Sequence, residues 1–328
     1  MRPIVLALAV TLGLGVSACG GDDERATPNT SDANLQVVAS FYPVAESAKR
    51  VGGQQAEVVN LTPAGTEPHD LELTPRQVDQ LEDADLVLYL GHGFQPAVEK
   101  VAERRNGPKL DLLSALPLEK GAVEAVEAEE HAGEENEKET GGKGRGEEEH
   151  AEESLDPHFW LDPVLMQSAV ERIERALSEA RPESREEFAR NAAAYRSELQ
   201  ALDDEYKTAL SSCQRKELVT SHAAFHYLAK RYGLSQEPIA GLSPEAEPNP
   251  QRLADLTDFV RRRNATTIFY ETLVSPEVAR TLARDTGTKT AVLNPLEGLT
   301  QEQAERGAGY ASVMRENLTA LKSALGCR

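Results

Sequence analysis

Three of the seven histidines stand in loops next to the ends of expected secondary-structure elements. His69 lies between a strand and a helix cap, His158 lies in a loop framed by two prolines, and His222 follows a strand over 217–220. Open α/β sheets bind their ligands at the carboxyl ends of strands. Three neutral imidazoles meeting there would suit a borderline cation such as zinc. No short H-x-x-x-H or C-x-x-C spacing requires such a site, and for each histidine taken alone a surface or hydrogen-bonding role is the favoured interpretation.

The elements that must position these histidines alternate between strands and helices. Apolar, β-branched runs of strand length recur at 35–41, 57–61, 86–90, 217–220, 266–270 and 289–293. Helix starts are marked by Thr74-Pro75, Asn249-Pro250 and Ser275-Pro276, and a further helix is expected over 223–232. Short strand–helix–strand units form parallel sheets covered by helices, so the sequence predicts an α/β fold.

One segment, 184–211, interrupts the alternation because it has no strand pattern, Gly or Pro. Its apolar residues recur every three or four positions, which predicts one amphipathic helix of about 28 residues, roughly 40 Å long. This helix would join an N-terminal lobe over 35–183 to a C-terminal lobe over 212–328. A stiff helix between lobes should keep their relative motion small.

The N-terminus has the features of an export signal with a lipid attachment site. The apolar run 4–16 is too short to span a membrane, for which about 20 residues are needed, and it ends in Val16-Ser17-Ala18-Cys19. This resembles a bacterial lipobox, so we expect a leader over 1–18, lipid on Cys19 and a flexible tether over 19–34. An ordinary secretory signal cleaved nearby is the alternative.

The remaining cysteines are expected to pair. The chain has three cysteines, so lipid on Cys19 would leave Cys213 and Cys327. Export to an oxidising compartment favours a disulfide between them over two separate thiols.

Half of the chain's charge belongs to one segment. The formal net charge is −20, and residues 119–154 alone carry 14 Glu against four basic residues. A chain this acidic is a poor ligand for nucleic acid or anionic lipid. The segment has few aliphatic residues, so we expect a disordered insert. Its His131 and His150 could collect metal weakly among the glutamates, or the insert could be a spacer without a role.

Several motifs together resemble a known family. In chain order they are Ala39-Ser40-Phe41-Tyr42-Pro43, Glu67-Pro68-His69-Asp70, Leu90-Gly91-His92-Gly93-Phe94, Asp156-Pro157-His158-Phe159-Trp160-Leu161-Asp162-Pro163, Ser221-His222-Ala223-Ala224-Phe225 and Asn294-Pro295-Leu296-Glu297. The chain from residue 35 to 325 is similar to the cluster A-I (or cluster 9) substrate-binding lipoproteins of zinc and manganese ABC importers. That resemblance implies two α/β lobes joined by one rigid helix, with the metal bound in the cleft between the lobes.

The resemblance also implies a ligand set. It places the imidazole ligands at His69, His158 and His222, and the carboxylate ligand at Glu297. Some relatives present an acid near the position of Asn294, and Glu67 or a water molecule is another candidate for the fourth ligand. Manganese members replace one histidine by a carboxylate, so a histidine at position 222 favours zinc over manganese.

Other residues near these motifs have weaker roles. His92 and Glu271 are candidates to contact the metal ligands and orient them. Phe159 and Trp160 should pack beside the metal. His226, four residues after His222, would share a helix face with it but is usually not a ligand in relatives.

These features together predict a binding protein. We expect a lipid-anchored monomer on the outer face of the cytoplasmic membrane that captures zinc and delivers it to an ABC permease, with affinity falling below about pH 6.5 as imidazoles protonate. A manganese-binding member of the family and a surface adhesin are the alternatives. A zinc hydrolase is disfavoured because neither H-E-x-x-H nor G-x-S-x-G occurs.

Overall fold

The computed structural model describes residues 34–118, 155–246 and 248–328. The predicted leader, the lipidation site Cys19 and nearly all of the tether lie outside the described residues. So does the acidic insert with His131 and His150. No helix within the described ranges is both long and apolar enough to cross a membrane.

The N-terminal half forms a four-stranded parallel sheet in the order β2-β1-β3-β4. Its strands are β1 (Leu35–Ala39), β2 (Ala56–Asn60), β3 (Leu86–Tyr89) and β4 (Lys109–Asp111). The helices that follow them are α1 (Tyr42–Gly52), α2 (Pro75–Asp83), α3 (Pro96–Arg104) and α4 (Leu112–Ala115). Thr74 begins α2 with a capping box to Gln77, as its position before Pro75 predicts.

The C-terminal half repeats this architecture with the order β6-β5-β7-β8. Its strands are β5 (Glu217–Thr220), β6 (Ser235–Pro238), β7 (Thr267–Tyr270) and β8 (Lys289–Val292). Its helices are α8 (His226–Tyr232), α9 (Pro250–Arg263), α10 (Glu277–Thr286), α11 (Gln301–Glu305) and α12 (Tyr310–Leu325). Both sheets are parallel and flanked by helices, which confirms the predicted fold class.

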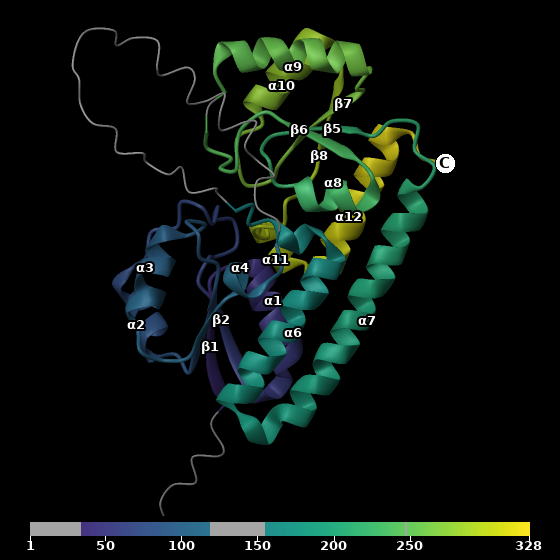
Figure 1. The fold of residues 1–328 in the computed structure, drawn as a ribbon. Coiled ribbons are helices and arrows are strands. Elements are labelled where there is room, and N and C mark those ends of the chain that lie inside the picture. Colours follow the sequence, from purple (N-terminus) through teal and green to yellow (C-terminus); the bar gives the residue numbers. More distant parts are fainter. Residues whose placement is uncertain (1–33, 119–154, 247) are drawn as a thin grey trace, which may run out of the picture. The chain divides into compact units, whose positions relative to one another are not determined.

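Between the two sheets in sequence lie α6 (Pro163–Ala180) and the long helix α7 (Arg185–Leu210). Figure 1 shows α7 running beside α6 and on to α12. The buried Tyr206 hydroxyl of α7 donates to the Met314 carbonyl of α12 at 2.6 Å. The predicted long helix is therefore present, and it packs against elements of both halves.

The expectation of a helix over 223–232 is wrong at its start, because α8 begins at His226. The His222 carbonyl accepts hydrogen bonds from the Thr220 hydroxyl and the Gln236 amide, both at 2.8 Å, and the backbone N–H of Ala223 donates to Gly241. These bonds hold His222 in a loop, so His222 and His226 do not share a helix face.

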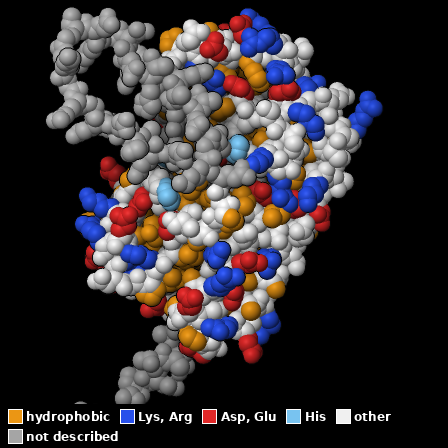
Figure 2. All heavy atoms as spheres, in the orientation of Figure 1, with side chains coloured by type: hydrophobic (Ala, Val, Ile, Leu, Met, Phe, Trp, Pro, Cys, Tyr) orange, Lys and Arg blue, Asp and Glu red, His pale blue; other side chains and the backbone are white. Residues whose placement is uncertain are grey.

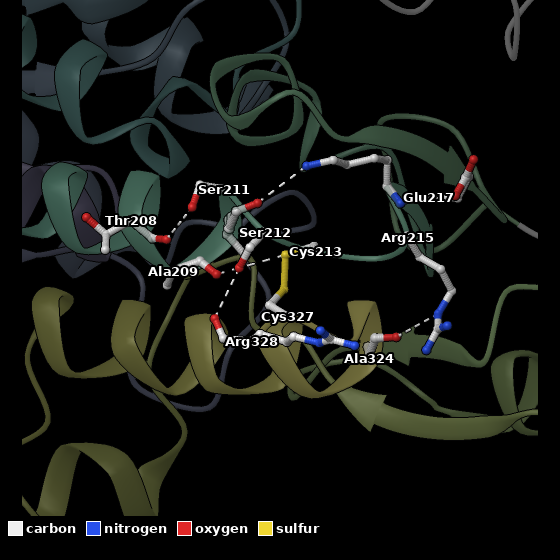
Figure 3. Close-up of a disulfide and its surroundings, with 12 residues drawn as sticks. Thr208, Ala209, Ser211, Ser212, Cys213, Arg215, Glu217, Ala324, Cys327 and Arg328 are labelled. Carbon is white, nitrogen blue, oxygen red and sulfur yellow. Dashed lines mark hydrogen bonds between the residues drawn. A yellow bond between two sulfur atoms is a disulfide. The ribbon is translucent and has the colours of Figure 1, made fainter.

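The disulfide between Cys213 and Cys327 is present, as predicted from the cysteine count. It joins the segment after α7 to the chain end after α12, as Figure 3 shows. Around it, the Ser212 hydroxyl donates to the Arg328 carbonyl at 3.1 Å and Arg215 Nε donates to the Ala324 carbonyl at 3.3 Å. The C-terminal end of α12 is thus fixed both covalently and by hydrogen bonds.

On the face that Figure 2 shows, acidic and basic side chains are interspersed among the described residues. Residues 119–154, which carry half of the net charge of −20, lie outside the described residues.

Candidate metal centre

Four side chains from four separate loops converge on one point. His69 lies in the loop between β2 and α2, and His158 directly precedes the short 3-10 helix Phe159–Leu161 that leads into α6. His222 follows β5, and Glu297 lies in the loop after β8. One donor atom from each of these residues lies within 4.8 Å of all the others, the only such group of His, Cys, Asp and Glu among the described residues.

The distances from Glu297 to the three imidazoles are close to those between the ligands of a tetrahedral zinc ion. Glu297 Oε1 lies 3.0 Å from His158 Nε2, 3.2 Å from His222 Nε2 and 3.4 Å from His69 Nε2. The Nε2 atoms of His158 and His222 are 3.3 Å apart. Ligands at about 2.0–2.1 Å from a tetrahedral zinc ion are separated from one another by roughly 3.3–3.4 Å. These four distances are therefore already close to those that a bound ion would impose, and all the donor atoms lie within 4.8 Å of one another.

The group is buried, with one more accessible side. The side chains of His158 and His222 are 0% exposed and that of Glu297 is 2% exposed, whereas His69 is 11% exposed. A buried polar group needs a partner, so this group must hold either protons or a cation among its donors.

Two carboxylates contact the Nδ1 atoms of the buried imidazoles. His158 Nδ1 lies 2.8 Å from Asp156 Oδ1, and His222 Nδ1 lies 2.6 Å from Glu271 Oε1. Metal-binding histidines commonly give their other ring nitrogen to a carboxylate, which fixes the ring and aims the free nitrogen at the metal. The sequence singled out Glu271 for this role. It missed Asp156, although an acid two residues before a candidate ligand was a usable signal.

These contacts determine the protonation of the metal-free protein. Burial alone would lower the pKa of His158 and of His222, but the carboxylates of Asp156, Glu271 and Glu297 outweigh it and raise both pKa values above the ordinary 6.5. Burial would likewise raise the pKa of Glu297, yet the nearby imidazoles hold it well below its ordinary value. Without a cation, these shifts favour an ionised Glu297 carboxylate beside protonated imidazoles.

Glu67 lies beside the group but shapes a loop. Its Oε2 accepts from the backbone N–H of His69 at 2.9 Å and of Asp70 at 3.4 Å. Burial, together with the charge of Glu297, raises the pKa of Glu67 to about 8. The structure thus places Glu297, and not Glu67, among the four converging side chains.

Aromatic rings form one wall of the centre. The Phe94 ring lies 4.6 Å from the His69 ring, and the Trp160 ring lies 5.1 Å from the His158 ring, between centroids. Phe159 packs 5.8 Å from Trp160, as expected for wall residues. These buried rings restrict how the imidazoles can tilt.

Three other candidates are not brought into the group. His92 is exposed and its Nε2 lies 3.3 Å from the Ser114 hydroxyl. His226 stands at the first position of α8 with its ring 5.5 Å from that of Tyr227. Asn294 is buried, but its side chain accepts from the backbone of its own loop.

Two parallel α/β sheets, with three imidazoles and a carboxylate gathered from the loops beside them, define a two-lobed metal-binding protein. The model of the ZnuA family, described as zinc-uptake complex component A, periplasmic, matches residues 37–324. The chain belongs to this family, which confirms the resemblance carried by its motifs.

Two relatives are named as zinc proteins. The chain is 41% identical over 322 residues to the zinc-binding lipoprotein AdcA of Streptococcus pneumoniae, covering 98% of this chain and 61% of AdcA. It therefore spans less than two thirds of that relative. It is 37% identical over 313 residues to the high-affinity zinc uptake system protein ZnuA of Bacillus subtilis, covering 94% of this chain and 93% of that protein.

Solved structures share the fold. The Zn(II)-bound ZnuA-like domain of Streptococcus pneumoniae AdcA has a TM-score of 0.70 at 37% identity, covering 89% of this chain and 99% of that domain. The laminin-binding protein Lmb of Streptococcus agalactiae, described as an adhesin with metal-transporting activity, has a TM-score of 0.73 at 30% identity. It is matched over 89% of this chain and 100% of its own.

Proposed function

We propose that this chain is an extracytoplasmic binding protein that captures Zn²⁺ and delivers it to an ABC permease. The observation that carries the proposal is the convergence of three imidazole nitrogens and one carboxylate oxygen within 4.8 Å of one another, with Glu297 Oε1 3.0–3.4 Å from all three Nε2 atoms. Membership in a family of zinc-uptake components supports delivery to a permease, and the names of AdcA and ZnuA support zinc as the cargo.

In this proposal the Nε2 atoms of His69, His158 and His222 and the Oε1 atom of Glu297 bind the ion. Four protein donors fill a tetrahedron and leave no open position for a water molecule or substrate. A catalytic zinc keeps such a position, so a closed and buried site fits a cargo ion and not a hydrolase. The family, accordingly, is one of uptake components and not of enzymes.

The donor set also favours zinc over manganese. Manganese prefers oxygen ligands and a higher coordination number, whereas zinc accepts three imidazoles and one carboxylate. Each buried imidazole already has its second nitrogen occupied by a carboxylate, which holds its Nε2 toward the centre.

We further propose the organisation that the sequence predicts: a leader over 1–18, a lipidated tether over 19–34, lobes over 35–183 and 212–328, and a linking helix over 184–211. Lipid on Cys19 would keep a monomeric protein at the outer face of the cytoplasmic membrane, near its permease. Lipoprotein relatives support this anchor.

The test is zinc binding by the purified mature chain after metal removal. Competition with a chromophoric chelator should give one tight zinc ion per chain and weaker manganese. X-ray absorption at the zinc edge should show four nitrogen or oxygen neighbours at about 2.0–2.1 Å. Absence of stoichiometric tight binding, or hydrolytic turnover of ester and peptide substrates, would contradict the proposal.

A further inference from the structure

The loop that presents Glu297 has a backbone conformation that needs outside support. Leu296, the residue directly before Glu297, has φ of 58° although it is not glycine, and its side chain is completely buried. A non-glycine residue in the left-handed region is unfavourable by itself and persists only where its surroundings determine it. The direction of the Glu297 side chain therefore depends on whatever holds this loop.

Two hydrogen bonds hold the loop from within and from the neighbouring ligand segment. Asn294 Oδ1 accepts from the backbone N–H of Leu296 at 2.7 Å, which closes a turn around Pro295. Trp160 Nε1, two residues after His158, donates to the Pro295 carbonyl at 2.7 Å.

The third support comes from Asn317 in the middle of α12. Its Oδ1 accepts from the backbone N–H of Asn294 at 2.8 Å, and its Nδ2 donates to the backbone carbonyl of Asn294 at 2.7 Å. Strand β8 is an edge strand, and its pairing toward β7 ends with the Leu293 N–H, which donates to the Tyr270 carbonyl at 3.0 Å. Asn294 lies beyond this pairing, and the Asn317 amide supplies its backbone partners. Asn317 is 2% exposed, and water cannot easily replace its two bonds.

Helix α12 is itself fixed relative to the centre. The Tyr310 hydroxyl donates to the Trp160 carbonyl at 2.6 Å, and Tyr206 of α7 donates to Met314 at 2.6 Å. The disulfide at Cys327 then secures the far end of the helix (Figure 3). Asn317 therefore lies on a helix that is fixed in place, and its hydrogen bonds can hold the loop in one position.

We propose that Asn317 is a positioning residue for zinc. It hydrogen-bonds both the N–H and the carbonyl of Asn294 and so orients the carboxylate of Glu297 toward the three imidazoles. Asn317 contributes none of the four donor atoms and acts only through Glu297. The inference rests on the zinc site proposed above.

A double-mutant cycle tests this role. Asn317→Ser removes both hydrogen bonds to Asn294. We expect zinc affinity to fall about 10–100-fold, the range typical of residues that orient metal ligands through hydrogen bonds. In a Glu297→Ala background the same substitution should change zinc affinity less than about twofold, since no carboxylate remains to be positioned. The matched control is Asn191→Ser in α7, which removes a 3.0 Å side-chain bond to the Val51 carbonyl; it should leave zinc affinity unchanged.

The outcomes separate the two proposals. If Glu297→Ala weakens zinc but Asn317→Ser does not, the inference about Asn317 is wrong while the zinc site stands. Equal losses from Asn317→Ser in both backgrounds would show a general structural effect and would also overturn it. If Glu297→Ala binds zinc like the parent, the ligand assignment fails and the inference fails with it.

A second variant guards against misfolding. Should Asn317→Ser not fold, Asn317→Asp keeps the side-chain shape and the acceptor for the Asn294 N–H but loses the donor. We expect it to weaken zinc at least tenfold with Glu297 present and less than twofold in the Glu297→Ala background. Parent-like affinity of a folded Asn317→Asp protein would count against the proposal.

Discussion

Zinc binding should release between one and two protons near pH 6, because the metal-free centre stores protons on its buried imidazoles. Both ring nitrogens of His158 face carboxylate oxygens, at 2.8 Å to Asp156 and 3.0 Å to Glu297. Both ring nitrogens of His222 do the same, at 2.6 Å to Glu271 and 3.2 Å to Glu297. An imidazole can donate from both nitrogens only when it is protonated, and zinc requires its Nε2 to be free.

The sign and size of the pH effect follow from these contacts. The pKa values of His158 and His222 are raised above 6.5, so protons compete with zinc up to a higher pH than for an ordinary histidine. Each proton displaced makes zinc affinity fall tenfold per pH unit, or about 1.4 kcal/mol. The loss should therefore begin above pH 6.5, earlier on acidification than the sequence alone suggests, and should reach between tenfold and a hundredfold per pH unit. Glu297 adds no proton in this range because its pKa is held well below 4.5.

The number of protons can be counted by calorimetry. Zinc titrations at pH 6 in buffers of different ionisation enthalpy give the protons released from the slope of apparent enthalpy against buffer enthalpy. Glu271→Gln replaces the carboxylate behind His222 by a neutral amide, so the count should fall by up to one. Glu205→Gln, which changes only an exposed partner of Arg315 between α7 and α12, is the matched control and should keep the parent count. No proton release from the parent between pH 6 and 7.5, or an unchanged count in Glu271→Gln, would refute the reasoning.

Four further changes have defined outcomes. Glu297→Ala should lower zinc affinity by at least tenfold in chelator competition, while Glu67→Ala should change it only a few-fold. A larger loss from Glu67→Ala than from Glu297→Ala would show that Glu67 is the fourth ligand. His222→Glu should lower zinc affinity much more than manganese affinity in parallel titrations, and unchanged affinity for both metals would remove His222 from the ligand set. Deletion of 120–153 should preserve folding and the single tight zinc ion, losing only weak extra equivalents, so disappearance of the tight ion would contradict it. Cys213→Ser should lower the free energy of unfolding in urea by up to about 4–5 kcal/mol, because the disulfide closes a loop across 114 positions, and an unchanged midpoint would show that the bond adds no stability.

The sequence predicted the strands that carry their own apolar pattern and missed those that do not. Six expected runs form strands, but β4 (Lys109–Asp111) and β6 (Ser235–Pro238) were not foreseen. Both are short, polar and at one edge of their sheets, and each pairs with a single neighbour. Such strands exist because a neighbouring strand offers its backbone, which no local pattern reveals.

The residues of the candidate centre likewise include some that a sequence pattern reveals and some that it does not. The motifs pointed to the four converging side chains, the position of Glu271 after the strand 266–270 pointed to that residue, and Asp156 stands two residues before His158 in its motif. Asn317 carries no such sign, because it lies within an ordinary amphipathic helix, 23 positions from the loop that it clasps. Its role exists only once α12 has packed beside the end of β8.

The placement of His158 also depends on packing that its position in the chain does not suggest. The segment around it precedes α6, yet its hydrogen bonds run mainly to the C-terminal half. The Tyr227 hydroxyl of α8 donates to the Asp156 carbonyl at 3.1 Å, and Arg231 of α8 lies 3.3 Å from Asp162. Arg231 also donates to Asp203 of α7 at 2.6 and 2.8 Å, which fixes its guanidinium.

These bonds tie the His158 segment to the same elements that carry His222 and Glu297. Helix α8 follows the His222 loop directly, and Trp160 joins the His158 segment to the Glu297 loop through Pro295. The 3.3 Å distance between the Nε2 atoms of His158 and His222 is therefore set by contacts within one packed group of elements. His69, whose loop follows β2 of the other sheet, is the fourth member of the group, with its Nε2 3.4 Å from Glu297 Oε1.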